Sequence, residues 1–148
     1  MIRDPEVGRI VVGVDGSPGS VAALRWAVAE ATRRQASVEV VGAWSFPLIA
    51  ATPFVPTAGY SWADLKEAVQ QVVDRAVSQL DPHPDVTVTT KVMEGSPARV
   101  LLDEAAGAEL LVVGTRGLGG AAELFLGSTS HACAHRSPVP VVIVPADR

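Results

Sequence analysis

The chain has 148 residues, of which 48% are hydrophobic and 19% charged, and its formal net charge is −4 at pH 7. This length and composition suit one compact domain with a sizeable core and exclude a disordered or fibrous chain. The acidic balance and the lack of a Lys/Arg cluster argue against sequence-independent binding to nucleic acid. Because no apolar run approaches ~18 residues, we expect no membrane span.

The cysteine content and the first residues indicate the compartment. Cys133 is the only cysteine, so an internal disulfide is impossible and a reducing cytoplasm fits. Residues 1–6 carry acids and a proline and lack the apolar centre of a signal peptide. We therefore expect a cytoplasmic protein that forms one domain over residues 1–148, with residues 1–7 as a loose tail and Cys133 packed in the last helix.

Apolar strands and helices alternate in the first half of the chain. The patterns predict strands over 9–14 and 38–44, a helix over 21–34, an aperiodic connection over 45–60 and a helix that begins at Ser61. Ser17 followed by Pro18 is typical of an N-cap and a first helical residue, and Asp64 stands where a weak capping box with Ser61 would place it. Connections as long as this one are often binding lids or mobile segments.

The same alternation continues to the end of the chain. The patterns predict strands over 86–92, 110–114 and 140–144, a helix from Ser96-Pro97 to about Ala106, and a helix over 129–136 capped by Ser128. Such alternation gives a parallel sheet with right-handed crossovers and helices on both faces. If the strand order is 3-2-1-4-5, it reverses between the strands that end at Asp15 and Gly114, and ligands bind beyond such a reversal.

The stretch from Leu110 to Ser130 carries the strongest chemical signal. Its apolar run ends at Gly114, Gly117 follows after two residues, and Gly127 stands just before three hydroxyl residues. Glycines let the backbone turn sharply and leave no Cβ in the way of a ligand. The first amides of the following helix are unpaired and partly positive, so this loop can hold phosphates. The alternative is an ordinary turn that the glycines merely permit.

These residues resemble the universal stress protein family over nearly the whole chain. The segment from Val12 to Ser17 is similar to the family's opening, and residues 136–144 are typical of its ending. Gly114-Thr-Arg-Gly117, nine residues and then Gly127-Ser128 match the family's ATP-binding pattern, G-2x-G-9x-G-[S/T], at every fixed position. Some members lack this pattern and hold no ATP; this chain has it.

The resemblance implies a fold, a cofactor and an assembly. The implied fold is a Rossmann-like α/β domain with a five-stranded parallel sheet of order 3-2-1-4-5 and helices on both faces. An adenine nucleotide, ATP or cyclic AMP, would occupy the crevice, and ATP would carry any Mg²⁺ or Mn²⁺ on its phosphates. The implied assembly is a homodimer.

The resemblance also implies which residues bind the nucleotide. Those residues lie at three strand ends and around the last helix: Gly13, Asp15, Ala43, Val113, Gly114, Thr115, Arg116, Gly117, Gly127, Ser128 and Thr129. Asp15 would face the nucleoside, Gly13 would allow close approach and Ala43 would line the adenine slot. The stretch from Val113 to Gly117 would follow the ribose and phosphates, and Gly127 to Thr129 would bind the distal phosphates. Asp15 can instead make a local Asx turn, and Arg116 can instead be a solvated loop residue.

Two other nucleotide-binding motifs fit the sequence poorly. Gly117 to Ala122 reads G-x-G-x-x-A, but it follows a late strand with one strand remaining, whereas a dinucleotide fingerprint opens an early βαβ unit. The sequence has no G-x-x-x-x-G-K-[ST], and its only lysines are Lys66 and Lys91, which argues against a P-loop enzyme.

The last predicted helix carries two further candidates for chemistry. His131 and His135 have a spacing that can bind zinc. No third ligand is evident and no Glu follows His131, so we interpret both as packed or solvated and predict no metal site. The hydroxyls of residues 128–130 lack a G-x-S-x-G elbow and a placed base, so no serine nucleophile is predicted.

The function that these patterns favour is an ATP-binding stress or signalling regulator that acts through its nucleotide-bound shape. The site lacks a recognisable general base, arginine finger or metal-binding carboxylate cluster, so at most slow ATP hydrolysis is expected. Two alternatives stay open. An adenylyl-transfer enzyme would need a second substrate pocket and a cation near the α-phosphate, and a dimeric interaction module would carry a vestigial site.

The homodimer is expected to form through Pro140 to Val144. This run would be the edge strand of the sheet, and a bare apolar edge must be covered. Pro140 has no N–H, which an edge position tolerates, and pairing with its own copy gives a closed two-fold contact. The alternative is that Val141 and Ile143 only cover the core of their own subunit.

Overall fold

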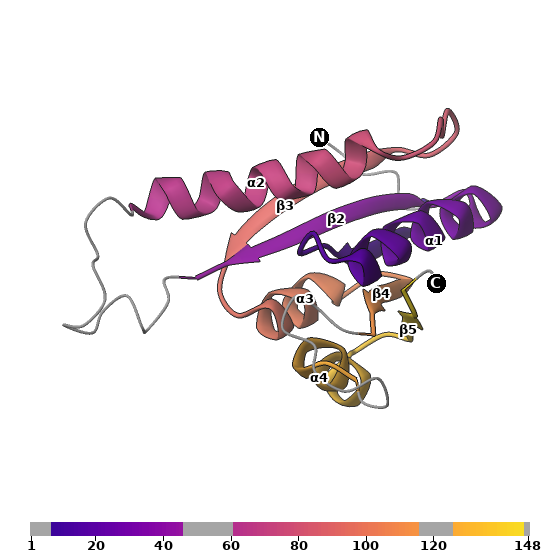
Figure 1. Cartoon of the computed structure of the whole chain (residues 1–148). Coiled ribbons are helices and arrows are strands. Elements are labelled where there is room, and N and C mark those ends of the chain that lie inside the picture. The colour runs from indigo at the N-terminus through magenta and orange to yellow at the C-terminus, as the bar shows by residue number, and fades with distance from the viewer. Residues whose placement is uncertain (1–6, 46–60, 116–125, 147–148) are drawn as a thin grey trace.

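The structure is a computed structural model that describes residues 7–45, 61–115 and 126–146. Within them the chain forms one five-stranded parallel sheet of order β3-β2-β1-β4-β5 and four helices (Figure 1). The elements in chain order are β1 (Arg9–Gly13), α1 (Pro18–Arg34), β2 (Ser37–Trp44), α2 (Trp62–Ser78), β3 (Val88–Glu94), α3 (Pro97–Ala105), β4 (Leu110–Gly114), α4 (Ser128–Arg136) and β5 (Val141–Val144). The predicted fold class and strand order are confirmed.

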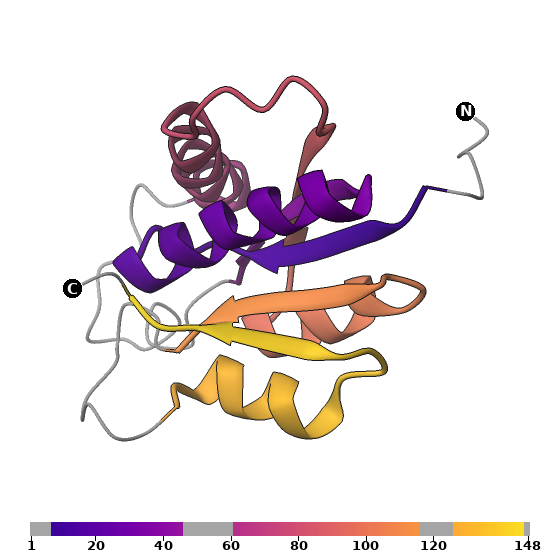
Figure 2. The same cartoon turned by 90° about the vertical axis from the view of Figure 1, so that its right-hand side faces the viewer.

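Helices cover both faces of the sheet and divide the core in two (Figure 2). Alternate residues of β1 point to opposite faces, so Ile10 and Val12 pack with Leu24 toward α1 and α2, whereas Val11 packs with Leu101 toward α3 and α4. Cys133 of α4 is fully buried on the α3 side, as predicted, and this burial raises the pKa of its thiol.

Two helices begin where the sequence predicts a cap. Ser17 Oγ accepts a hydrogen bond from the Ser20 amide at 3.2 Å, with Pro18 as the first residue of α1. Ser61 Oγ accepts from the Asp64 amide at 3.1 Å, and the Asp64 carboxylate accepts from the Ser61 amide at 3.2 Å, which completes the predicted capping box. α1 therefore begins at Pro18, as the cap signal predicts, and the apolar stretch from Val21 lies inside it.

The third strand lies two residues later than predicted. Val86 belongs to the preceding turn, where its amide donates to the His83 carbonyl at 3.1 Å. The strand is aligned by its pairing with β2, which places Trp44 opposite Glu94. The predicted range 86–92 was wrong because alternation alone does not reveal where the neighbouring strand ends.

The start of α4 also corrects a prediction. Its N-cap is Gly127 rather than Ser128, and no side-chain hydrogen bond caps the helix within the described residues. β5 begins one residue late, because Pro140 contributes its carbonyl oxygen, 3.0 Å from the Leu111 amide, but no donor. None of the helices in residues 7–45, 61–115 and 126–146 is long and apolar enough to span a membrane.

Two predicted segments fall largely outside the described residues. They are the N-terminal tail over 1–7, of which only Val7 is described, and the connection over 45–60, of which only Ser45 is described.

Candidate functional site

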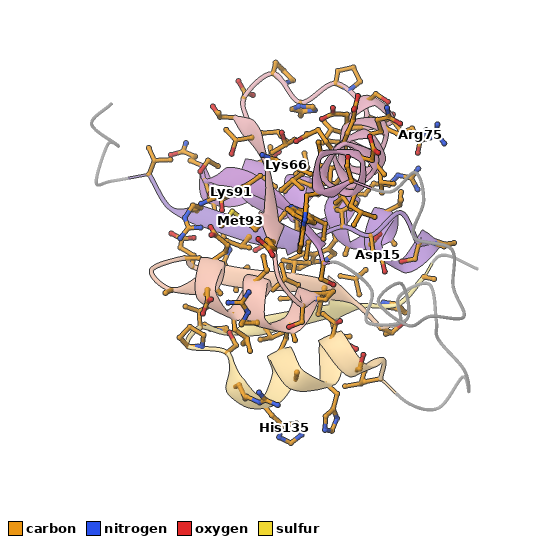
Figure 3. The ribbon with its side chains drawn as sticks, turned by 90° about the vertical axis from the view of Figure 1, so that its left-hand side faces the viewer. Asp15, Lys66, Arg75, Lys91, Met93 and His135 are labelled. Atoms are coloured by element: carbon orange, nitrogen blue, oxygen red, sulfur yellow. The ribbon has the colours of Figure 1, made fainter. Side chains whose placement is uncertain are left out.

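The candidate site lies at the carboxyl ends of the central strands. β1 is flanked by β2 and β4, so the strand order reverses between β1 and β4, as the sequence predicts for a binding crevice. The topology therefore brings Gly13, Ala43 and Gly114 to one edge of the sheet. Asp15, two residues beyond the end of β1, lies at this edge (Figure 3).

Thr115 ties the end of β4 to the start of α4. Its carbonyl oxygen accepts hydrogen bonds from the Gly127 amide at 2.7 Å and from Ser130 Oγ at 2.8 Å. Its amide donates to the Val144 carbonyl at 3.2 Å. Ser130 is buried, and its hydroxyl oxygen also lies 3.1 Å from the Gly127 carbonyl oxygen. The residues on either side of the glycine loop are therefore fixed next to one another.

The N-terminus of α4 presents main-chain donors at this edge. The first helical hydrogen bond runs from the His131 amide to the Gly127 carbonyl at 2.9 Å. The amides of Ser128, Thr129 and Ser130 precede that bond and have no acceptor within the helix. Gly127 has no side chain with which to cap them. This partly positive helix end can receive phosphate oxygens.

Asp15 shapes the turn between β1 and α1. Its Oδ1 accepts a hydrogen bond from the Ser17 amide at 2.9 Å, and its own amide donates to Ser20 Oγ at 3.3 Å. Gly16 has a φ of +87°, in the left-handed region that favours glycine. The Asx turn considered as an alternative for Asp15 is thus present. The side chain is nonetheless exposed, and its role toward a nucleoside stays a prediction.

Two of the candidate glycines have a packing role that the sequence analysis missed. A Cβ on Gly13 would lie 2.6 Å from Leu101 Cδ1 of α3. A Cβ on Gly114 would lie 2.7 Å from the Gly19 carbonyl carbon and 3.1 Å from the Ser20 amide nitrogen. Gly114 therefore lets the backbone of α1 approach the sheet closely, whereas Gly13 makes room for the end of the Leu101 side chain. A glycine at a strand end looks the same in the sequence whether protein or ligand approaches it.

The remaining candidates differ in what they can offer. Val113 is buried among core residues on the α3 side, so only its backbone can face a ligand. Ala43 is half-buried at the end of β2, where a small side chain leaves room. Arg116 and Gly117 lie outside the described residues.

A second polar cluster lies on the α3 face of the sheet, toward the amino ends of the strands. Arg9 Nη1 is 3.5 Å from Glu39 Oε1, and Lys91 Nζ is 3.0 Å from Glu104 Oε2. The Arg9 guanidinium also donates to the carbonyl oxygens of Glu104 and Ala106, each at 3.0 Å. It thereby satisfies acceptors at the C-terminal end of α3. Lys91 and Asp15 lie on opposite sides of the view in Figure 3.

The two carboxyl groups of this cluster have opposite pKa shifts. Burial raises the pKa of Glu39, a hydrogen bond with Glu104 raises it further, and Arg9 and Lys91 only partly offset this. Burial also opposes ionisation of Glu104, but hydrogen bonds with Glu39 and Lys91 lower its pKa overall. The pair therefore favours a proton on Glu39 and a charge on Glu104. The sequence signal for this cluster was Glu39 itself, a lone charge inside an apolar strand.

The chain matches a known family and known relatives. The sequence model of the Universal stress protein family matches residues 6–145. Universal stress protein Rv2005c of Mycobacterium tuberculosis is 36% identical over 143 residues, which cover 97% of this chain and 47% of that protein. The chain thus spans about half the length of the curated relatives it matches.

Solved structures have the same fold. A structure described as a universal stress protein in complex with cAMP has 25% identity and a TM-score of 0.66, and the match covers 96% of this chain and 99% of that one. The structure of protein MJ0577 has a TM-score of 0.77 at 19% identity and covers 97% and 99% of the two chains. Sequence and fold agree with the resemblance noted above: the chain belongs to the universal stress protein family.

Proposed function

We propose that this protein binds an adenine nucleotide, ATP above all, beyond the carboxyl ends of β1, β2 and β4. The observation that carries the proposal is the complete G-2x-G-9x-G-S pattern, from Gly114 to Ser128, in a chain of this family. The contacts of Thr115 with Gly127 and Ser130 support it, because they hold the two ends of that pattern together. The relative described as a complex with cAMP, at 25% identity, supports an adenine ligand.

Each part of the site has a proposed role. The amides and hydroxyls of Ser128 and Thr129 bind the distal phosphates, where a Mg²⁺ or Mn²⁺ ion can accompany them. The stretch from Val113 to Gly117 follows the ribose and phosphates, and Ala43 borders the base. Asp15 binds the nucleoside, because a carboxylate beside a triphosphate would repel it.

The protein acts, in this proposal, as a nucleotide-dependent stress or signalling regulator with at most slow ATP hydrolysis. Main-chain amides, hydroxyls and one carboxylate form the described part of the site, and these groups suit binding better than phosphoryl transfer. We further propose that residues 1–148 form one domain and that it works in the cytoplasm, where the buried thiol of Cys133 stays reduced.

Calorimetry with the full chain tests nucleotide binding. We expect ATP to bind with a dissociation constant in the micromolar range or tighter, and GTP to bind at least ~10-fold more weakly. AMP, cyclic AMP and adenosine, measured in the same way, rank the contributions of the phosphates. If no adenine nucleotide binds, the proposal fails and the interaction module with a vestigial site takes its place. Release of pyrophosphate with an acceptor would instead indicate adenylyl transfer.

Asp15→Asn separates the nucleoside from the phosphates. The Asn side-chain oxygen can still accept from the Ser17 amide, so the turn is kept. We expect ATP and adenosine to weaken by similar factors. A variant that loses ATP but keeps adenosine would contradict the assignment of Asp15 to the nucleoside.

We also propose a homodimer through Pro140 to Val144. β5 is an edge strand of the sheet, and all four of its residues remain partly exposed in the single chain. Val142 also packs against the α1-side core, and Ile143 against the α3-side core, so both serve their own subunit as well. Sedimentation should show a dimer at tens of micromolar. Val142→Lys should give a folded monomer, because a lysine stem can lie along the surface with its charge in water. A monomeric parent would end this idea.

A further inference from the structure

The outer surface of α4 carries a pair of histidines that the proposed nucleotide site does not use. His131 and His135 stand one turn apart, and both are exposed. Their ring centres are 4.5 Å apart and the ring planes are tilted by 51°. Figure 3 shows His135 projecting from α4 away from the sheet. In the described part of the chain, no hydrogen bond or ion pair engages either ring.

The spacing of the rings matches what two imidazoles need to share one cation. A metal held about 2.0–2.1 Å from one nitrogen of each ring puts the ring centres about 4.5 Å apart when the two bonds meet at a right angle, as in octahedral or square-planar coordination, and about 5.2 Å apart at the tetrahedral angle that zinc prefers. The observed pair has the shorter of these separations before any ion is added.

We propose that His131 and His135 form a two-imidazole binding site for one borderline divalent transition-metal cation, such as Zn²⁺ or Ni²⁺, on the surface of α4. Imidazole nitrogen suits these ions, whereas Mg²⁺ and Ca²⁺ prefer oxygen ligands. Among the described residues no third His, Cys, Asp or Glu completes a group of three. Water therefore fills the remaining coordination positions, and the ion exchanges freely with solvent. This site differs from the three-ligand zinc sites for which the sequence offered no partner.

Metal titration of the untagged chain without nucleotide tests this site alone. We expect Zn²⁺ and Ni²⁺ to bind at one ion per chain in calorimetry. His131→Ala and His135→Ala should each weaken binding at least ~10-fold, since each removes one of two ligands. Both side chains are exposed, so thermal unfolding should be unchanged.

The third histidine of the chain gives a matched control. His83 lies in the connection between α2 and β3, and its Nδ1 is 3.0 Å from the Asp81 carbonyl oxygen. His83→Ala should leave metal binding unchanged, and substoichiometric Ni²⁺ should broaden the imidazole NMR signals of His131 and His135 but not those of His83. Absence of saturable binding, or equal binding by the double variant, would overturn the proposal. Neither outcome decides the proposed ATP binding, because that proposal uses the amides and hydroxyls of Ser128 and Thr129 and neither imidazole ring.

Discussion

The two ends of the sheet handle their polar groups in opposite ways. Toward the amino ends, Arg9, Glu39, Lys91 and Glu104 contact one another, and Arg9 also binds the last carbonyls of α3. At the carboxyl ends, α4 begins at Ser128, and its N-cap, Gly127, provides no side-chain cap among the described residues. Its first amides consequently face outward from the helix with no acceptor inside it.

This difference indicates that the polar groups at the amino ends stabilise the fold, whereas those at the carboxyl ends are suited to bind a ligand. Polar groups that satisfy one another hold elements in place but leave nothing for a ligand. A rigidly held helix start with donors to spare is suited to an incoming anion. Variants at the amino ends should therefore change the free energy of unfolding, and variants at the start of α4 should change nucleotide affinity.

Arg9→Ala should lower the free energy of unfolding by about 2–4 kcal/mol, because it removes the closest cation from the buried Glu39 carboxyl and leaves the Glu104 and Ala106 carbonyl oxygens without their donor. Chemical denaturation measures this loss. Arg99→Ala is the control: Arg99 is exposed at the other end of the sheet and makes one 3.2 Å bond to the Glu94 carbonyl. That variant should stay within about 0.5 kcal/mol of the parent. Equal losses in the two variants would remove the proposed difference between the ends.

The sequence predicted the fold well because its signals are local. Strand–helix alternation implies a parallel sheet, and the capping box at Ser61 and Asp64 is legible from spacing alone. The sequence did not give the exact ends of β3, which lies two residues later than predicted, and it did not reveal the cluster around Arg9. Both depend on neighbours far along the chain. Glu39 and Glu104, for example, are 65 residues apart, and only folding brings them together.

Gly114→Ala should destabilise the protein by about 1–3 kcal/mol, because the added Cβ would meet the backbone of Gly19 and Ser20. Gly114 lies at the carboxyl ends of the strands and belongs to the ATP-binding pattern. A loss of stability here would show that one glycine of that pattern also has a packing role. Thermal unfolding measures it, and Gly107→Ala serves as a control for added side-chain volume, since nothing lies within 4 Å of a Cβ there. Gly107 has a φ of +81°, so part of any loss in that control is backbone strain. A Gly114→Ala protein as stable as the parent would refute the packing role.

Glu39→Gln should change how stability depends on pH. The folded protein raises the pKa of Glu39 above its ordinary value of 4.5. The parent therefore holds its full contribution from Glu39 below that value and loses it as pH rises through the folded pKa. Glutamine does not titrate, so the variant should gain stability relative to the parent as pH rises from acidic to neutral.

Glu104→Gln should change the pH dependence of the free energy of unfolding in the opposite direction. The pKa of Glu104 is lowered in the folded state, so its contribution is present above the ordinary value and lost as pH falls. The free energy of unfolding of the parent should thus increase relative to that of this variant as pH rises. Denaturation series across pH compare the three proteins, and parallel curves would show that the two carboxyls do not interact as described.

The candidate site was less predictable than the fold. The glycine motif begins at Gly114, the last residue of β4, and ends at Ser128, the first residue of α4. The N-cap of α4, however, is Gly127 rather than the predicted Ser128. The same sequence can begin a helix with or without a side-chain cap, because the backbone angles at the N-cap residue decide whether its side chain can reach the first amides. Asp15 had two interpretations: the Asx turn is present, with a 2.9 Å bond from the Ser17 amide, and the nucleoside role stays a prediction.

The binding of ATP by the Ser128→Asp variant tests whether the start of α4 binds the phosphates of ATP. A carboxylate in the first turn of α4 favours the helix dipole, so the free energy of unfolding should be equal to the parent's or about 0.3–1 kcal/mol higher. The same charge should repel phosphates and weaken ATP at least ~10-fold, AMP less and adenosine least. Ala134→Asp places an equal charge near the other end of α4 and should leave ATP affinity unchanged. We expect a stable Ser128→Asp protein with impaired ATP binding, and parental ATP affinity in that protein would show that the start of α4 does not bind the phosphates.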